Sequence, residues 1–364
     1  MTLWNQWVDA QLEEIKEQGR WRGLLVLDGP GPRFRLDGRP VVSFASNDYL
    51  GLSAHPEVRS AAARALARSG AGSGSSRLIV GTMRAHAELE EAIADWTGAE
   101  AALVFASGYH ANVGVMATLG AGALIVSDEL NHASIIDGAR LARAQVAVYR
   151  HGDLDQAADL LAQAPGRALV VTDTVFSMDG DVADVAALSE LCDRSGALLV
   201  LDDAHAVLDR PPVAGSVACV RVGTMSKALG SQGGFVVGDK RWINLLVNRA
   251  RPFIFSTALA PPSIAAGRAA IDICRSGEGD RLRAVLRSHT DTVRPGHPSP
   301  IVPVLLGSET EAVRAAARLL DSGLLVPAIR PPTVPPGTSR LRVSLSAAHH
   351  HDDVARLVTA LGEL

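Results

Sequence analysis

Residues 222–234 read VGTMSKALGSQGG and place a single lysine, Lys227, among small hydroxyl and glycine residues. Mostly apolar runs flank this stretch at 218–222 and 235–237, and the nearest charged residues are Arg221 and Asp239. A lysine in such a semi-buried loop loses its proton readily and can form a Schiff base. On this stretch alone, an ordinary strand–loop–strand with a lysine that reaches solvent is the alternative.

The composition predicts a globular protein with a large core. The chain has 364 residues, of which 47% are hydrophobic and 20% are charged, and its net charge is -4. It shows no basic excess that would favour nucleic acid or an anionic membrane as a partner. No apolar run approaches the roughly 20 residues of a membrane span, and the N-terminus lacks a secretory signal. The three cysteines are scattered without metal-ligand spacing, so we expect a cytoplasmic protein with no metal site.

We predict three parts along the chain. Residues 1–43 form an N-terminal arm, with a helix over 3–18 and a hairpin over 34–44 that turns at Asp37-Gly38. Residues 44–258 form a large α/β domain. Residues 259–364 form a small α+β domain, and its expected elements are strands near 301–306, 324–328 and 339–345 and helices near 309–321 and 351–362.

The large domain is predicted from an alternation of short apolar runs with helical patterns. The seven apolar runs are 101–105, 123–127, 146–149, 168–173, 197–202, 219–224 and 235–237. Helical patterns fall between most of them, at 109–119, 132–142, 155–163 and 184–194. This order predicts a mostly parallel seven-stranded sheet with both faces covered. The last two strands have no helix between them, so we expect them to be antiparallel.

Ligands of open α/β sheets bind at the carboxyl ends of the strands. The polar residues that follow the predicted strands include Ser107 to His110, Asp128, Asn131, His132, Asp173, Ser177 to Asp181, Asp202 to His205, Thr224, Ser226 and Lys227. We therefore expect hydroxyls, imidazoles, carboxylates and one amine to converge along one edge of the sheet.

This set of groups fits pyridoxal phosphate (PLP). PLP needs a lysine, a carboxylate that keeps the ring nitrogen protonated, a ring-facing side chain, and N–H groups at a helix start for its phosphate. Lys227 would form the imine, Asp202 would pair with the ring nitrogen, His205 would reach the ring hydroxyl, and the Ser107–Tyr109 segment would hold the phosphate. A nucleotide-binding doubly wound fold is the alternative, but the P-loop and dinucleotide fingerprints are absent.

Seven stretches then resemble the α-oxoamine synthases, PLP enzymes of fold type I. They are SNDYLGL at 46–52, SGY at 107–109, HAS at 132–134, VFSMDGD at 175–181, DDAH at 202–205, SK at 226–227 and RPPTVP at 330–335. They extend over nearly the whole chain, from about residue 44 to 346. The RPPTVP run and residues 228–234 are most similar to the oxononanoate branch of that family.

The resemblance implies a role for each matching residue. It makes Lys227, His132, His205 and Asp202 catalytic. Cofactor contacts fall on Lys227, Gly108, Tyr109, His132, Ser177, Asp202, His205, Thr224 and, across a dimer interface, Ser256 and Thr257. Substrate contacts fall on Asn47, Thr333, Arg342 and Arg20, where Arg20 would meet the far carboxylate of the acyl group, with Arg22 as the alternative.

The implied reaction is the decarboxylative condensation of L-alanine with pimeloyl-CoA or pimeloyl-acyl carrier protein. It yields 8-amino-7-oxononanoate for biotin biosynthesis, in a homodimer. The alternatives are other reactions of the family, of the glycine C-acetyltransferase, 5-aminolevulinate synthase or serine palmitoyltransferase type, or a non-catalytic binding protein with the same fold.

One segment departs from the family. After the Ala-His pair the family usually continues with a glycine-rich run that ends in Gly-Arg-Gly, whereas residues 206–215 here read AVLDRPPVAG. Only 22 positions separate His205 from Lys227. Because this loop is shortened, the resemblance does not determine the dimer contacts or the route of the acyl chain in this segment.

Overall fold

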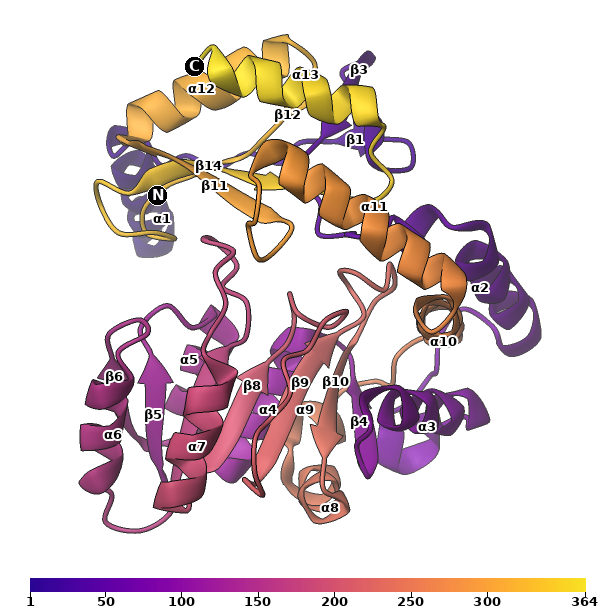
Figure 1. Ribbon diagram of the computed structural model, residues 1–364, viewed down its shortest axis with the longest axis vertical. Helices are drawn as coiled ribbons and strands as arrows, with labels where there is room; N and C mark the ends of the chain where they lie inside the picture. The colour runs from indigo at the N-terminus through magenta and orange to yellow at the C-terminus, as the bar shows by residue number, and fades with distance from the viewer.

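The computed structural model describes residues 1–364, and its centre is the predicted seven-stranded sheet (Figure 1). The strands lie in the order β4-β10-β9-β8-β7-β5-β6. Their bounds are β4 Ala101–Phe105, β5 Leu124–Asp128, β6 Gln145–Tyr149, β7 Ala168–Asp173, β8 Leu198–Asp202, β9 Cys219–Thr224 and β10 Gly234–Gly238. β10 is antiparallel to both of its neighbours, and the other pairs are parallel. The predicted sheet and its antiparallel pair are confirmed.

Helices cover both faces of this sheet, which explains why its strands are nearly continuous apolar runs. One face packs on helices α4 (Gly108–Leu119), α5 (Ala133–Ala142), α8 (Lys240–Arg249) and α9 (Arg251–Ile254). The other packs on α6 (Leu154–Ala162) and α7 (Val185–Ser195). Two glycines allow close packing here. Gly138 lets α5 approach α4, because a Cβ at this position would lie 2.7 Å from the Met116 side chain. Gly114 lets α4 approach the sheet, because a Cβ there would lie 3.0 Å from the Phe105 side chain.

The C-terminal part forms a second, smaller layer above the strand ends (Figure 1). It consists of the sheet β11-β14-β13 with helices packed around it. The bounds are α10 Pro261–Cys274, α11 Gly277–Val293, β11 Ile301–Gly307, α12 Glu309–Asp321, β13 Ala328–Ile329, β14 Ser339–Ser344 and α13 His351–Gly362. Its apolar residues join those of α3 (Arg84–Thr97) and of the lysine loop in one continuous core cluster.

The single strand expected near 324–328 is instead two short strands in two different sheets. β12 (Leu324–Leu325) runs parallel to β3 of the N-terminal hairpin, and β13 pairs with β14. Pro327 lies between them, and since proline has no N–H to donate, it interrupts the ladder. The N-terminal hairpin is thereby joined to the C-terminal part through the sheet β1-β2-β3-β12.

The N-terminal arm contains α1 (Leu3–Glu17), β1 (Leu27–Asp28), β2 (Arg33–Leu36) and β3 (Arg39–Ser43). This confirms the predicted helix and hairpin. Between the arm and the large sheet lie the short helix η1 (Leu52–Ala54), α2 (Pro56–Ser69) and a π-helical turn, η2 (Arg77–Gly81). The glycine-rich run before η2 is anchored to the chain itself, because Ser73 Oγ donates to the Leu259 carbonyl oxygen at 2.7 Å and Ser76 bridges to Thr257.

None of the helices is both long enough and apolar enough to cross a membrane. No group of three or more histidine, cysteine or acidic side chains is arranged to hold a metal ion.

Candidate active site

A cavity of about 200 Å³ opens at the carboxyl ends of the central strands. Its lining comes from the ends of β4, β5, β7, β8 and β9 and from the segments that follow them. The lining residues are Ser107, Gly108, Tyr109, Asn112, His132, Ser134, Asp173, Val175, Ser177, Asp202, Ala204, His205, Thr224, Ser226 and Lys227. Eight of the residues predicted to be catalytic or cofactor-binding therefore face one cavity.

Lys227 lies at the centre of this cavity, with its Nζ 2.6 Å from His205 Nε2. Burial lowers the pKa of Lys227 to about 8, although the carboxylates of Asp202 and Asp173 act in the opposite direction. Burial and the nearby cations of Lys227 and Arg342 lower the pKa of His205 well below its ordinary value. His205 is therefore neutral, and its other nitrogen, Nδ1, lies 2.6 Å from the hydroxyl of Tyr49.

Asp202 is buried at the end of β8 and has no cationic side chain within ion-pair distance. Its Oδ2 accepts from Asn112 Nδ2 at 2.6 Å, and its Oδ1 accepts from the Ala204 N–H at 2.9 Å. Asn112 also donates to Ser134 Oγ at 2.9 Å, and Ser134 Oγ lies 2.7 Å from His132 Nδ1. These contacts fix the orientation of the carboxylate and of the His132 ring.

Asp173, at the end of β7, is a second buried carboxyl group in the same cavity. Its Oδ1 has no hydrogen-bond partner. Burial and the neighbouring charge of Asp202 raise the pKa of Asp173 well above its ordinary value. Two carboxyl groups and one lysine in this cavity favour a ligand with a protonated ring nitrogen, since it would supply the cation that Asp202 lacks.

An anion cradle lies beside these groups at the start of α4. The helix begins at Gly108, and Ser107 Oγ accepts from the His110 N–H at 3.2 Å. The backbone is tightly packed here, because a Cβ on Gly234 would lie 2.4 Å from the Ser107 carbonyl oxygen and one on Gly108 would lie 3.3 Å from Thr224 Cβ. A helix N-terminus lined by glycine and threonine binds phosphate well. The residues present thus fit PLP at both its ring and its phosphate.

Two predicted substrate residues contact one another at the side of the cavity. The buried Arg342 donates through Nη2 to Asn47 Oδ1 at 3.1 Å and through Nη1 to Ser344 Oγ at 2.6 Å. Its Nε donates to the carbonyl oxygen of Ser177, a cavity residue. Arg342 and Asn47 are therefore positioned by the loop that also carries Ser177.

Six predicted residues do not line this cavity: Asn47 and Arg342, which are linked to it through Ser177, and Arg20, Thr333, Ser256 and Thr257. Arg20 Nη2 lies 3.9 Å from Glu309 Oε1, and Thr333 is exposed. Ser256 and Thr257 lie beside the exposed Phe255, away from the cavity of their own chain. The roles predicted for the site residues, inside this cavity and outside it, stay predictions.

Sequence reasoning missed three residues that the structure brings to the centre. Tyr49 stands in the SNDYLGL stretch, where the resemblance gives a role to Asn47 alone, and Asp173 stands at a strand end without a predicted role. Asn112 lies within the largely apolar helix α4. The only feature of the sequence that indicates a role for it is a polar side chain among apolar neighbours. Their contacts with Asp202 and His205 are long-range and depend on the assembled sheet.

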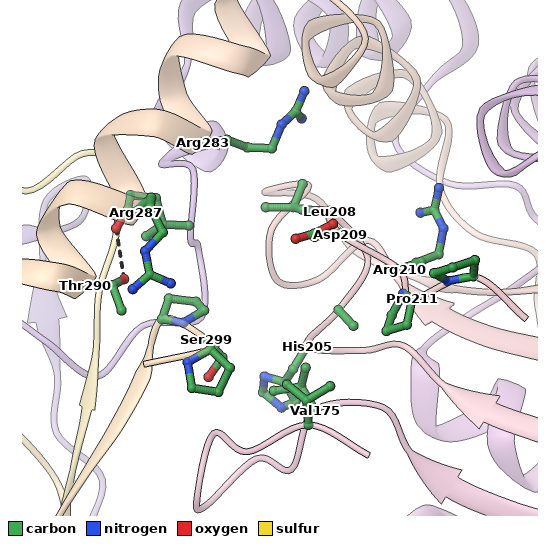
Figure 2. A pocket seen from close by; sticks show the side chains of 16 residues that line it. Val175, His205, Leu208, Asp209, Arg210, Pro211, Arg283, Arg287, Thr290 and Ser299 are labelled. Carbon is green, nitrogen blue, oxygen red and sulfur yellow. Dashed lines mark hydrogen bonds between the residues drawn. The ribbon is translucent and has the colours of Figure 1, made fainter. Parts of the chain in front are cut away.

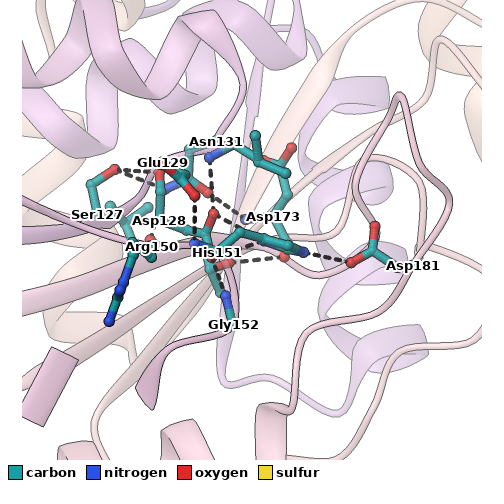
Figure 3. Close-up of polar contacts among 12 residues, drawn as sticks. Ser127, Asp128, Glu129, Asn131, Arg150, His151, Gly152, Asp173 and Asp181 are labelled. Carbon is teal, nitrogen blue, oxygen red and sulfur yellow. Dashed lines mark hydrogen bonds and ion pairs between the residues drawn. The ribbon is translucent and has the colours of Figure 1, made fainter. Parts of the chain in front are cut away.

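A polar network behind the cavity fixes the loop that carries Ser177 (Figure 3). His151 Nε2 lies 2.7 Å from Asp181 Oδ2, and its Nδ1 lies 3.2 Å from both oxygens of Asp128. Burial alone would lower the pKa of His151, but the two carboxylates outweigh it and raise the pKa. His151 thus links the end of β5 to the loop 177–181 through its contacts with Asp128 and Asp181.

Comparisons with known proteins agree with this geometry. The family model described as aminotransferase class I and II matches residues 39–361. The 8-amino-7-oxononanoate synthase of Anaeromyxobacter sp. (strain K) is 48% identical over 98% of this chain and 94% of its own length. That of Geobacter sulfurreducens is 44% identical over 98% of this chain and 97% of its own length. Among solved structures, a serine palmitoyltransferase variant from S. paucimobilis with a bound PLP–myriocin adduct is 27% identical, with a TM-score of 0.92, over 100% of this chain and 98% of that chain.

These matches span both predicted domains and include every strand end that lines the cavity. The chain belongs to the aminotransferase class I and II family and, within it, to the 8-amino-7-oxononanoate synthases.

Proposed function

We propose that this protein uses PLP to condense L-alanine with a pimeloyl thioester, giving 8-amino-7-oxononanoate, CO2 and the free thiol. The observation that carries the proposal is the contact of Lys227 with His205 in a cavity that also holds Asp202 and Asp173. The 48% identity to a synthase of this name, over nearly the full chain, supports the choice of substrates.

Each cofactor contact is assigned to a residue of the cavity. Asp202 would pair with the ring nitrogen, His132 would lie against the ring, and Ser177 with His205 would meet the ring hydroxyl. The phosphate would lie at Gly108, Tyr109 and Thr224. Bound PLP supplies an electron sink that stabilises negative charge at the α-carbon of the amino acid.

The chain's own groups then handle the protons and the charges. Lys227 Nζ takes the α-proton of L-alanine, and its pKa of about 8 suits a base that works near neutral pH. His205 and Tyr49 hold the amine in place through their 2.6 Å contacts. Arg342, with Asn47 beside it, receives the carboxylate of alanine, and Thr333 contacts the substrate.

The bond changes balance with no further reactant. A bond forms between the α-carbon of alanine and the thioester carbonyl carbon, and the thiol leaves. The carboxylate of alanine leaves as CO2, and a proton returns to the α-carbon. Burial of Asp202 and Asp173 and desolvation of the half-buried Lys227 limit the water around the charged groups while this happens.

We also propose that the protein works as a homodimer with sites at the interface. Leu78, Ile79 and Val80 form an exposed apolar strip, and Phe255 is exposed to 69%. The two segments are tied together by the bridge between Ser76 and Thr257. Ser256 and Thr257 would then reach the phosphate site of the neighbouring subunit, which explains why they lie away from their own cavity.

The reaction is tested with purified protein loaded with PLP. We expect a visible absorbance band that is lost in Lys227→Ala and kept in Lys240→Ala, which removes a lysine outside the cavity. Thiol release from pimeloyl-CoA should be fastest with L-alanine among L-alanine, glycine and L-serine. The proposal fails if wild-type protein shows no band, or if glycine or serine supports faster release.

A further inference from the structure

Tyr49 belongs to a chain of hydrogen bonds that begins at Lys227 and ends at Arg342. Its hydroxyl lies 2.6 Å from His205 Nδ1, and His205 Nε2 lies 2.6 Å from Lys227 Nζ. On its other side the hydroxyl lies 3.3 Å from Asn47 Oδ1, which also accepts from Arg342 Nη2 at 3.1 Å. Tyr49 is only 1% exposed, so its hydroxyl depends on these partners. The chain therefore joins the proposed base to the side chain proposed to receive the carboxylate of alanine.

A turn that is anchored on two sides fixes the position of Tyr49. Oδ1 of Asp48 accepts from the Leu52 N–H at 2.9 Å, and the carbonyl oxygen of Asp48 accepts from Ser346 Oγ at 2.6 Å. The carbonyl oxygen of Tyr49 itself accepts from the Ala347 N–H at 2.8 Å. Because η1 and the segment after β14 both hold this turn, the phenol ring has a fixed place at the side of the cavity.

The surroundings of His205 make its ring neutral. Lys227 and Tyr49 occupy its two nitrogens. Figure 2 shows the ring beside Val175 at a second cavity, of about 340 Å³, in whose lining Asp209 is the single acidic residue. Burial and the nearby cations lower the pKa of His205 well below its ordinary value. The charged and titratable groups that face the pair of His205 and Lys227 are Asp173 of β7, Asp202 of β8, His132 before α5 and Arg342 of β14.

The direction of each hydrogen bond follows from these charges. With a pKa of about 8, Lys227 is mainly an ammonium group at pH 7, and an ammonium group can only donate, so His205 Nε2 accepts. A neutral imidazole that accepts at Nε2 carries its proton on Nδ1, and Nδ1 therefore donates to the Tyr49 hydroxyl oxygen. Burial raises the pKa of Tyr49 to about 12, although Arg342 acts in the opposite direction, so Tyr49 keeps its own proton. That proton is donated to Asn47, whose oxygen is oriented by Arg342.

We propose that Tyr49 is a positioning residue that holds His205 as the Nδ1–H tautomer and thereby keeps Nε2 free to accept a hydrogen bond from the Lys227 amine. Tyr49 does not line the cavity, so it acts through His205. Without its hydroxyl, Nδ1–H would be a donor without an acceptor. The proton would then move to Nε2 in part of the molecules, where it would oppose the ammonium group. The inference rests on the proposed function only in taking Lys227 as the amine that reacts with PLP.

The tautomer is measured on cofactor-free protein by NMR. In protein with nitrogen-15-labelled histidine, protonated and unprotonated ring nitrogens give well-separated signals, and His205→Gln identifies the signals of His205. We expect wild-type protein at pH 7 to have a protonated Nδ1 and an unprotonated Nε2. Tyr49→Phe removes only the hydroxyl and should replace this pattern by a mixture of the two tautomers. A protonated Nε2 in the wild type overturns the inference, as does an unchanged pattern in Tyr49→Phe.

The rate of PLP uptake gives a second measurement. Only the neutral amine of Lys227 reacts, so the rate should rise with pH and level off near the pKa of that amine, about 8. We expect Tyr49→Phe to move this plateau down by about one pH unit, because a protonated Nε2 disfavours the ammonium form. A plateau at the wild-type pH in Tyr49→Phe would contradict the inference.

Tyr149→Phe is the matched control. It removes the hydroxyl of another buried tyrosine, at the end of β6 and outside the cavity, and should change neither the tautomer nor the plateau. The same changes in Tyr149→Phe would show a general effect of losing a buried hydroxyl and would overturn the inference. If Tyr49→Phe does not fold, the tautomer of the wild type still decides. If wild-type protein takes up no PLP, the proposed function fails, whereas the tautomer of the cofactor-free protein tests the inference independently.

Discussion

Lys227 is reactive because its desolvation lowers the pKa of the amine more than the nearby carboxylates raise it. Burial lowers its pKa to about 8, against the carboxylates of Asp202 and Asp173. The neutral imidazole of His205 accepts one contact from the amine without adding a charge. At pH 7, a pKa of about 8 leaves roughly a tenth of the amine unprotonated and nucleophilic, far more than for an ordinary lysine.

This pKa sets the pH dependence of cofactor uptake. We expect the rate at which cofactor-free protein takes up PLP to rise about tenfold per pH unit below pH 8 and to level off above it, because only the neutral amine reacts. Stopped-flow absorbance measures this rate.

The Asp202→Asn variant tests whether the pKa of Lys227 sets this pH dependence. Asp202 favours the ammonium form, so its loss should lower the pKa of Lys227 further and move the plateau to lower pH. A wild-type rate that climbs steadily to pH 10, as for an ordinary lysine, would contradict the assignment.

At the scale of elements, the loop 177–181 joins the two layers of the molecule. Ser299 Oγ donates to the Gly180 carbonyl oxygen at 2.7 Å. Arg340, on β14, forms an ion pair with Asp179 of the loop. Gly180 has a φ of 72° and no room for a Cβ, which would lie 2.0 Å from the Ile301 carbonyl oxygen. His151 fastens the same loop to the end of β5, so strand ends, loop and C-terminal sheet form one unit.

His151 should stabilise the fold in a pH-dependent way. Its pKa is raised in the folded protein, so its contribution is fully present below the ordinary histidine pKa of about 6.5 and is lost as the pH rises through the folded value. We expect His151→Gln to lower the free energy of unfolding by up to about 1 kcal/mol at pH 6 and by clearly less at pH 9.

Urea unfolding at the two pH values measures this difference. His350→Gln, which removes an exposed histidine at the start of α13, should show no such dependence. Equal losses at pH 6 and pH 9 would mean that His151 acts through packing against Phe176 and not through its charge.

At the scale of the whole molecule, several apolar surfaces are left without a partner. Helix α1 has no buried residue, although Trp4, Trp7 and Leu12 lie along it. Ile79 and Val80 are exposed to 74% and 75%. Exposed apolar surfaces of this kind are typical of a subunit interface, and the proposed dimer would cover them.

A single charge in the strip should therefore disrupt the dimer. We expect Ile79→Asp to weaken the association at least tenfold and to lower the affinity for PLP, because Thr257 is tied to this strip through Ser76. Sedimentation velocity and PLP titration measure the two effects. Leu305→Asp changes an equally apolar side chain, 66% exposed on β11, and should leave both unchanged. A wild-type protein that sediments as a monomer would rule out the dimer.

The alternation of apolar runs and helical patterns was enough to predict the seven strands, their covered faces and the antiparallel pair at the lysine loop. Local signals suffice there, because burial of both faces requires continuous apolar strands and because a helix between two strands makes them parallel. The same rule placed Lys227, Asp202, His205 and His132 at one edge, since the carboxyl ends of parallel strands meet there.

Contacts between residues far apart in the chain were decided only by the tertiary structure. The pairing of Asn112 with Asp202, of Tyr49 with His205 and of β12 with β3 joins segments whose own patterns carry no sign of the partner. The charge state of Lys227 and the cavity that surrounds it belong to the same class. The pKa of a side chain depends on how much water the assembled fold removes from it. A cavity depends on which segments the fold brings together as its walls. Neither property is therefore encoded in any one stretch of the chain.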